Sequence, residues 1–244
     1  MGKRTRIVFI IYIIVVLMFF AFLLVWNGIV LLNNPDSEKY PVRGVDVSSY
    51  QGEINWDMLS EQDISFAFIK ATEGSNYVDE YFKNNYKEAL KSNLRIGAYH
   101  FFSFDSQGST QADNFIATVD KTENMLPPVV DFEFYGDKQS NLPDEESTRE
   151  QLDILLSRLE EYYGMKPVIY ATQKSYSLYL SGYYQEYDLW IRNVITSPHI
   201  DDKREWTFWQ YTNREALKGY KGKEKYIDMN VFCGNQQEFE SYAK

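Results

Sequence analysis

The feature that most constrains this chain is an unbroken apolar run of 20 residues near its amino terminus, Ile7 to Trp26. A helix rises about 1.5 Å per residue, so this run covers about 30 Å, the thickness of one hydrocarbon core. A cleaved signal peptide is the alternative, but its apolar region is about 7 to 15 residues long and ends at small residues. The sequence therefore predicts one N-terminal transmembrane helix, with residues 7–32 as the anchor.

Basic residues before the run predict its orientation. Lys3, Arg4 and Arg6 precede the apolar residues, and a basic flank stays on the cytoplasmic side of a membrane. Residues 1–6 are thus predicted to be a cytoplasmic tail of a single-pass cell membrane protein, with everything after Leu32 extracellular. Residues 33–41 are polar and contain two prolines. We expect them to be a linker that extends at most about 30 Å at about 3.3 Å per residue, so that the domain at 42–244 lies close to the membrane.

The charge of the exported part narrows its partners. Without the three basic residues of the tail, 22 Lys and Arg face 35 Asp and Glu, a net charge of −13. Nucleic acid is a poor partner for such a surface. Four tryptophans remain after the helix, and their flat rings suit sugars or fill a core equally well. These four tryptophans are Trp56, Trp190, Trp206 and Trp209.

The cysteine and histidine content excludes some chemistries. Cys233 is the only cysteine, so no intrachain disulfide forms and the fold depends on a hydrophobic core. His100 and His199 are the only histidines. They leave no zinc-type ligand set and no Cys/His dyad at a recognised spacing. We expect no metal and no organic cofactor.

Alternating strand-like and helix-like segments predict the fold class. Eight short apolar, β-branched or aromatic runs occur at 45–47, 66–70, 96–102, 129–134, 167–172, 188–192, 207–211 and 226–231. Helices are expected at 57–62, 81–90, 111–119, 147–163 and 173–180, the fourth with a capping box of Ser147 and Glu150 and a stop at Gly164. Strands separated by helices pair in parallel through right-handed crossovers. We therefore predict an α/β fold, a modified TIM-like barrel with five β/α units followed by three strands.

Four acidic residues sit inside apolar strands, where an acid needs an explanation. They are Asp46, Asp131, Glu133 and Asp228. Residues i and i+2 of a strand point to the same side, so Asp131 and Glu133 share a face. Two carboxyls that close cannot both ionise easily, and one of them should keep a proton at neutral pH, as a general acid must. Glycoside cleavage requires such a pair, although a salt-bridged pair that supports the barrel or a cation site is the alternative.

His100 lies at the end of a predicted strand. It is expected either to bond a sugar hydroxyl or orient a carboxylate, or to be purely structural.

The sequence motifs that contain these residues resemble those of glycoside hydrolase family 25, the N-acetylmuramidases of bacterial and phage lysozymes. The resemblance covers nearly all of Arg43 to Gly234. Its markers stand in order: Gly-Val-Asp-Val-Ser-Ser-Tyr-Gln-Gly at 44–52, Ile-Asn-Trp at 54–56, Phe-Ile-Lys-Ala-Thr-Glu-Gly at 68–74, Gly-Ala-Tyr-His-Phe-Phe at 97–102, Gln111-Ala112, Leu-Pro-Pro-Val-Val-Asp-Phe-Glu at 126–133, Trp209-Gln210-Tyr211 and Ile-Asp-Met-Asn at 227–230. Each marker is weak alone, and the ordered set is specific.

This resemblance implies a catalytic domain that cleaves the β-1,4 bond between N-acetylmuramic acid and N-acetylglucosamine in peptidoglycan. By position, Glu133 is the general acid, and Asp131 orients the substrate acetamide or stabilises charge. Asp46 and Asp228 complete the acidic pocket. The implied sugar contacts are Tyr99, Tyr170, Trp209 and Gln210, with His100 beside them. Attack by the substrate's own acetamide fits two acids on one strand better than attack by a protein carboxylate.

Two departures from the family pattern and two alternatives remain open. Tyr50 stands where an aromatic residue, often tryptophan, is usual, and the segment Lys218 to Lys225 is more basic than expected of the family. That segment either contacts a stem peptide or teichoic acid, or is a solvated turn. The alternatives to a muramidase are a catalytically silent, membrane-tethered wall-binding protein and a hydrolase of another amino sugar polymer. A short tether favours local wall remodelling over lysis, and the sequence identifies no envelope protein partners.

Overall fold

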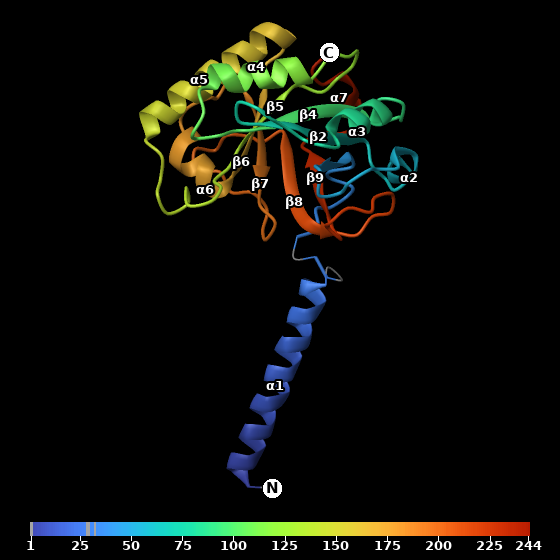
Figure 1. Ribbon diagram of the computed structural model, residues 1–244. Coiled ribbons are helices and arrows are strands. Elements are labelled where there is room, and N and C mark those ends of the chain that lie inside the picture. Colours follow the sequence, from blue (N-terminus) through green and yellow to red (C-terminus); the bar gives the residue numbers. More distant parts are fainter. Residues whose placement is uncertain (1, 28–29, 32) are drawn as a thin grey trace.

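A long apolar helix precedes a folded domain in this computed structural model, which describes residues 2–27, 30–31 and 33–244. Helix α1 (Lys3–Trp26) is 24 residues long with a mean hydropathy of 3.3 over its best window, which is long and apolar enough to cross a membrane. None of its residues is buried, and Figure 1 shows it extending away from the domain. Residues 28, 29 and 32 of the predicted anchor lie outside the described residues.

Eight strands close into a barrel, as predicted. They are β1 (Arg43–Val47), β2 (Phe66–Glu73), β4 (Arg95–Phe101), β5 (Val129–Phe132), β6 (Val168–Thr172), β7 (Asp188–Arg192), β8 (Phe208–Glu215) and β9 (Ile227–Phe232). Neighbours pair in parallel from β1 through β2 and β4 to β8, and β9 closes the ring antiparallel to both β8 and β1. A two-residue strand, β3 (Tyr77–Val78), pairs with the end of β2 and was not predicted.

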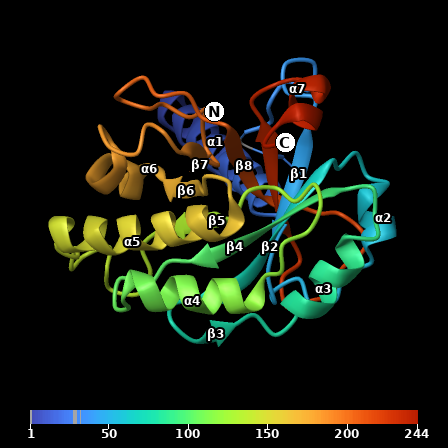
Figure 2. The same ribbon diagram turned by 90° about the horizontal axis from the view of Figure 1, so that it is seen from above.

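Helical segments follow five of the strands and confirm the expected five β/α units. These segments are α2 (Trp56–Ser60), α3 (Phe82–Ala89), α4 (Gly108–Thr118), α5 (Glu145–Tyr163) and α6 (Gln173–Ser175), the last running into the π-helix η1 (Tyr176–Leu180). No helix separates β7, β8 and β9. Figure 2 shows α3, α4 and α5 along one side of the barrel. A short helix, α7 (Gln236–Ser241), follows the last strand.

The start of α5 differs from the prediction. Asp144 is the N-cap, and its side chain accepts a hydrogen bond from the backbone N–H of Ser147 at 2.9 Å. The expected capping box of Ser147 and Glu150 is therefore wrong. An aspartate cap followed by two glutamates places negative charge at the positive end of the helix, which favours the earlier start. Gly164 ends the helix in the left-handed region at φ 73°, as expected.

Aromatic rings fill the lower half of the barrel interior. Phe68 stacks on Trp190 with ring centroids 4.7 Å apart, and Phe66 and Phe208 pack below them. Phe239 of α7 covers this layer at the amino-terminal end of the strands, where Arg95 donates a hydrogen bond to its carbonyl. These rings fill the half of the barrel interior that lies toward the amino-terminal ends of the strands. The unfilled half therefore lies at the carboxyl ends of the strands.

The segment before β1 packs against the barrel instead of extending from it. The Asn33 side chain donates hydrogen bonds to the carbonyls of Asn193 and Thr196 at 3.0 and 2.8 Å. Tyr40 packs on Trp206 and Trp209 at centroid distances of 5.4 and 6.2 Å. These contacts cover strands that have no helix over them.

Glycine on β4 makes room for an interior ring, which gives a test of the core. A Cβ at Gly97 would lie 2.6 Å from the Phe68 ring. Gly97→Ala is therefore expected to lower the free energy of unfolding by about 1–3 kcal/mol, the usual cost of overpacking. Urea denaturation of the purified protein measures this. The cost should shrink in a Phe68→Leu background, because a shorter side chain relieves the overlap; an equal cost in both backgrounds contradicts this packing.

Candidate active site

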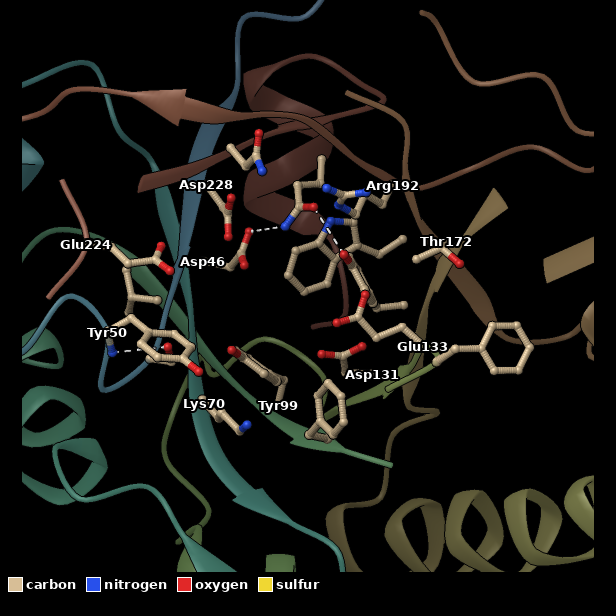
Figure 3. Close-up of a pocket in the computed structure, with 18 of the residues that line it drawn as sticks. Asp46, Tyr50, Lys70, Tyr99, Asp131, Glu133, Thr172, Arg192, Glu224 and Asp228 are labelled. Atoms are coloured by element: carbon tan, nitrogen blue, oxygen red, sulfur yellow. Dashed lines mark hydrogen bonds between the residues drawn. The ribbon is translucent and has the colours of Figure 1, made fainter. Parts of the chain in front are cut away.

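A cleft of about 590 Å³ opens at the carboxyl ends of the barrel strands, within the usual size range of ligand sites. Seven of the residues singled out from the sequence line it: Asp46, Tyr99, Asp131, Glu133, Tyr170, Gln210 and Asp228. They come from β1, β4, β5, β6, β8 and β9, so residues far apart in sequence meet here. Figure 3 shows the four carboxyls turned toward one space.

Asp46 and Asp228 face each other across the strands that close the barrel. Their Cα atoms are direct partners in the β1–β9 register. Burial and the neighbouring charge of Asp46 raise the pKa of Asp228 well above its ordinary value. Burial also raises the pKa of Asp46, but hydrogen bonds from Asn230 and Gln210 favour its charged form. Of the two carboxyls, Asp228 therefore binds a proton more readily than Asp46.

Amide groups fix the deeper carboxylate. One oxygen of Asp46 accepts hydrogen bonds from the side-chain amides of Gln210 at 2.9 Å and Asn230 at 2.8 Å. The oxygen of Gln210 then accepts from the Tyr170 hydroxyl at 3.1 Å, and the oxygen of Asn230 from the Trp190 indole N–H at 2.8 Å. Since each amide has both ends bonded, this chain fixes the orientation of its members on five strands.

Asp131 and Glu133 lie side by side at the end of β5, as the spacing predicted. Asp131 is 8% exposed and one of its oxygens has no hydrogen-bond partner within the described residues. Burial and the nearby charge of Glu133 raise the pKa of Asp131 well above its ordinary value. Burial also raises the pKa of Glu133, while the charge of Arg192 lowers it. The two carboxyls titrate together and bind a proton more tightly than separate carboxyls in water.

Two basic side chains that were not predicted as site residues offset part of the charge of the four acids. Arg192 ends β7 and Lys70 lies on β2, and both line the cleft. Lys70 also pairs with Glu73 at 2.7 Å and lies 4.6 Å from the centre of the Phe101 ring. Strand alternation gave a signal for both: Arg192 is two residues after Trp190, and Lys70 two after Phe68, on inward-facing positions.

Two tyrosines remain neutral donors in the cleft. Burial raises the pKa of Tyr99 well above its ordinary value, and the charges of Asp46 and Asp131 add to the rise. Burial and the charges of Glu133 and Asp131 do the same for Tyr170. Both hydroxyls therefore stay protonated at neutral pH and present O–H groups beside the carboxyls.

His100 does not reach the cleft, so its predicted substrate contact is not supported. It is fully buried on the outward face of β4, with a hydrogen bond of 2.7 Å to the Thr72 hydroxyl and one of 3.0 Å to the oxygen of Gln111. Burial lowers its pKa to about 4, so the ring is neutral. Gln111 also accepts from the backbone N–H of Ser103 at 2.7 Å. His100 thus holds the loop after β4, which was the structural alternative.

Trp209 also lies outside the cleft. It is 2% exposed and points outward from β8, where its indole N–H donates to the Asn193 carbonyl at 2.9 Å. Its neighbour Gln210 points inward because successive residues of a strand alternate sides. The interior tryptophan that lines the cleft is instead Trp190. Among the described residues no group of three or more His, Cys, Asp or Glu has a geometry that could hold a metal ion.

Comparison with known proteins gives consistent matches. The family model described as Glycosyl hydrolases family 25 matches residues 45–220. A solved family 25 glycosyl hydrolase from Bacillus anthracis is 53% identical with a TM-score of 0.83, covering 87% of this chain and 98% of its own. A bacterial lysozyme from Streptomyces coelicolor is 31% identical with a TM-score of 0.74, covering 83% and 96%. Lysozyme M1 of Streptomyces globisporus is 31% identical over 210 residues, 80% of this chain and 68% of that protein.

The pair of Asp46 and Asp228 predicts a pH-dependent cost to stability. Folding raises the pKa of such a carboxyl above its value in the unfolded chain. The free energy of unfolding therefore falls as the pH rises from the unfolded-state pKa through the folded-state pKa, and the carboxyl causes no loss of stability at a pH below both. Asp228→Asn removes that cost, and the amide of the new side chain can still donate a hydrogen bond to Asp46. We expect a free energy of unfolding higher by roughly 1–3 kcal/mol at pH 7.

The gain should fade as the pH falls below the ordinary aspartate range, where the unfolded chain is protonated too. Thermal and urea unfolding at pH 7, 5 and 3.5 measure it, with Asp57→Asn on the exposed face of α2 as the control. A gain independent of pH contradicts the assignment of the proton to Asp228.

Proposed function

The chain belongs to glycosyl hydrolases family 25, and from this premise we propose that its acidic cleft hydrolyses the β-1,4 bond between N-acetylmuramic acid and N-acetylglucosamine. The observation that supports this most is the set of four carboxyls with raised pKa values that converge in one cleft. Hydrolysis of a glycosidic bond requires an acid for the leaving oxygen and negative charge near the anomeric carbon. The class is that of a lysozyme, a peptidoglycan hydrolase.

Glu133 is the general acid in this proposal. It lies beyond the last residue of β5, at the mouth of the cleft, and is partly exposed, whereas Asp131 is two residues deeper and buried. The proton must reach the glycosidic oxygen of a polymer that enters from solvent, so the outer carboxyl is the better placed donor. Arg192 stabilises the carboxylate that remains after proton transfer.

Asp131 is proposed to bind the acetamide group of the substrate. Its unpartnered buried oxygen is a costly feature without a ligand. An acetamide N–H donated to that oxygen would satisfy it and stabilise the anionic form of Asp131. The proton that the pair shares would then move to Glu133, where the leaving oxygen needs it. The same contact turns the acetamide oxygen toward the anomeric carbon, which supports attack by the substrate's own acetamide over attack by a protein carboxylate.

Membrane anchoring is the second part of the proposal. Helix α1 is apolar, has no buried residue and carries Lys3, Arg4 and Arg6 in its first turn. A single-pass helix with a cytoplasmic amino terminus fits these features and leaves the barrel outside the cell. An enzyme held this way cannot diffuse through the wall, which suits local remodelling of peptidoglycan.

Loss of the acid should abolish cleavage without loss of the fold. Glu133→Gln is isosteric but cannot donate a proton to the leaving oxygen, so we expect turnover on intact peptidoglycan to fall by roughly 10²–10⁴-fold. The assay is mass spectrometry of the released reducing ends, which should be muramic acid. Tyr50→Phe, at the exposed rim of the cleft, is the control and should keep activity within a few fold.

A different product identifies a different function. Release of reducing N-acetylglucosamine, or faster cleavage of chitin than of peptidoglycan, would assign the cleft to another polymer. Wall binding by both wild type and Glu133→Gln with no release from either would make the protein a tethered wall-binding module.

The anchor has a separate test. The full chain expressed with its amino-terminal helix should stay in the membrane fraction after high-salt and alkaline washes, because an apolar helix is not held by charge. Residues 33–244 should be soluble after the same treatment. Release of the full chain as a shortened soluble protein would show that the helix is a cleaved signal.

A further inference from the structure

The chain enters the barrel at the end that carries the cleft. Asn33 is 9% exposed and is bonded to the carbonyls of Asn193 and Thr196. Asn193 directly follows Arg192, the last residue of β7, whose side chain lines the cleft. The first firmly held residue after the helix therefore lies at the carboxyl ends of the strands, beside the cleft.

From this point the chain passes along the outside of the barrel to its opposite end. Tyr40 packs on Trp209 about midway. Val42 then joins the interior layer of Phe66 and Phe232 at the amino-terminal end of the strands, where its carbonyl accepts from the Phe232 N–H at 3.0 Å. The segment from 33 to 42 thus runs from the cleft end to the closed end, and β1 returns in the other direction.

The distance between helix and cleft is short. Six residues, 27–32, separate Trp26 from Asn33, and they reach at most about 20 Å at about 3.3 Å per residue. Arg214 donates a hydrogen bond of 2.7 Å to the Trp26 carbonyl, and its guanidinium lies 5.0 Å from the centre of the Trp26 ring. Its neighbour Asn213 lines the cleft. Figure 1 shows β7 and β8 running toward α1, with α7 at the far end.

We infer that the cleft opens toward the membrane that holds the enzyme, and that its substrate is the glycan lying directly on the outer membrane surface. This inference rests on the proposed anchoring and the proposed muramidase reaction. A gap limited by six residues admits a single polysaccharide strand and excludes a thick wall layer. The enzyme is therefore positioned to cut strands that are still attached to, or newly delivered at, the membrane.

The charge of the cleft end fits a lipid surface. Four exposed lysines lie on the loop between β8 and β9: Lys218, Lys221, Lys223 and Lys225. The sequence alone left this basic segment without an assigned role. Each lysine near an anionic leaflet is attracted to it, although Glu215 and Glu224 at the same end offset part of this attraction. Exposed acids on other loops at this end, Asp105 after β4 and Asp137 after β5, reduce the attraction further.

The orientation can be measured without any activity. In the full chain with Cys233→Ser, which removes the exposed native thiol, a donor dye is attached at Lys221→Cys on the cleft end or at Glu240→Cys on α7. The protein is reconstituted in phosphatidylcholine vesicles, with and without phosphatidylglycerol, that carry trace acceptor-labelled lipid. The two sites lie at opposite ends of barrel strands that are mostly five to eight residues long, so they differ in height by roughly 20 Å at about 3.3 Å per residue. We therefore expect energy transfer from position 221 to be at least twofold higher.

Equal transfer from the two positions, or higher transfer from position 240, overturns the inference. Asn33→Ala supplies the matched control, because it removes the two bonds that hold the chain at the cleft end and touches no cleft residue. It should reduce the difference between the two labels while hydrolysis of soluble glycan stays unchanged. Failure of the full chain to float with the vesicles would remove the anchor and the inference together.

A second assay tests the substrate. In vesicles that carry both the full chain and membrane-attached glycan strands, we expect those strands to be cleaved. Isolated walls added outside the vesicles should be cleaved at least tenfold more slowly. The soluble form, residues 33–244, should cut both. If the soluble form cuts neither, the proposed reaction fails; if the anchored chain cuts isolated walls as fast as attached strands, the reaction stands and the membrane-facing cleft is wrong.

Discussion

Strand β1 carries the constraint on which both the barrel and its site depend. It pairs in parallel with β2 and antiparallel with β9, so it is the strand through which the ring closes. The same register places Asp46 opposite Asp228. A shift of one residue would turn Asp46 to the outer face and Val45 and Val47 into the interior. The hydrogen bonds from Gln210 and Asn230 to Asp46 therefore stabilise the closed barrel only in the register that also forms the cleft.

The cleft is an unfavourable arrangement that the rest of the interior must support. Four carboxyls with raised pKa values share it with two basic side chains, Lys70 and Arg192. Removing like charges from water costs stability unless each is paired or protonated. The aromatic layer beneath, with Phe68 stacked on Trp190, supplies apolar burial that offsets this cost. Such a division between a stable end and a strained, polar end is typical of enzymes built on barrels.

Sequence pattern predicted the fold and the four acids because each depends on local periodicity. Alternation within the strands assigned Asp131 and Glu133 to one face, and the helices between early strands predicted parallel pairing. The predicted substrate contacts of His100 and Trp209 were wrong because successive strand residues point to opposite faces. Each is adjacent in sequence to a residue that points into the barrel, and a sequence motif does not show which of its residues point inward. Arg192 and Lys70 were not predicted, although each lies two residues after an inward-facing aromatic residue, Trp190 and Phe68. The N-cap of α5 was missed because Asp144 and Ser147 offer the same capping chemistry.

The absence of helices over β7, β8 and β9 gives the segment that follows α1 a structural role. A strand that carries Trp209 and Tyr211 on its outer face must have those rings covered, and elsewhere in the barrel a following helix provides the cover. Here the segment that follows α1 provides it, through Tyr40 and the hydrogen bonds of Asn33. The segment expected to be a free spacer is thus part of the packed domain. Since the same side chains both bury the outer face of β8 and hold the chain that follows α1 beside the cleft, the packing of the barrel fixes the point at which this chain enters the domain.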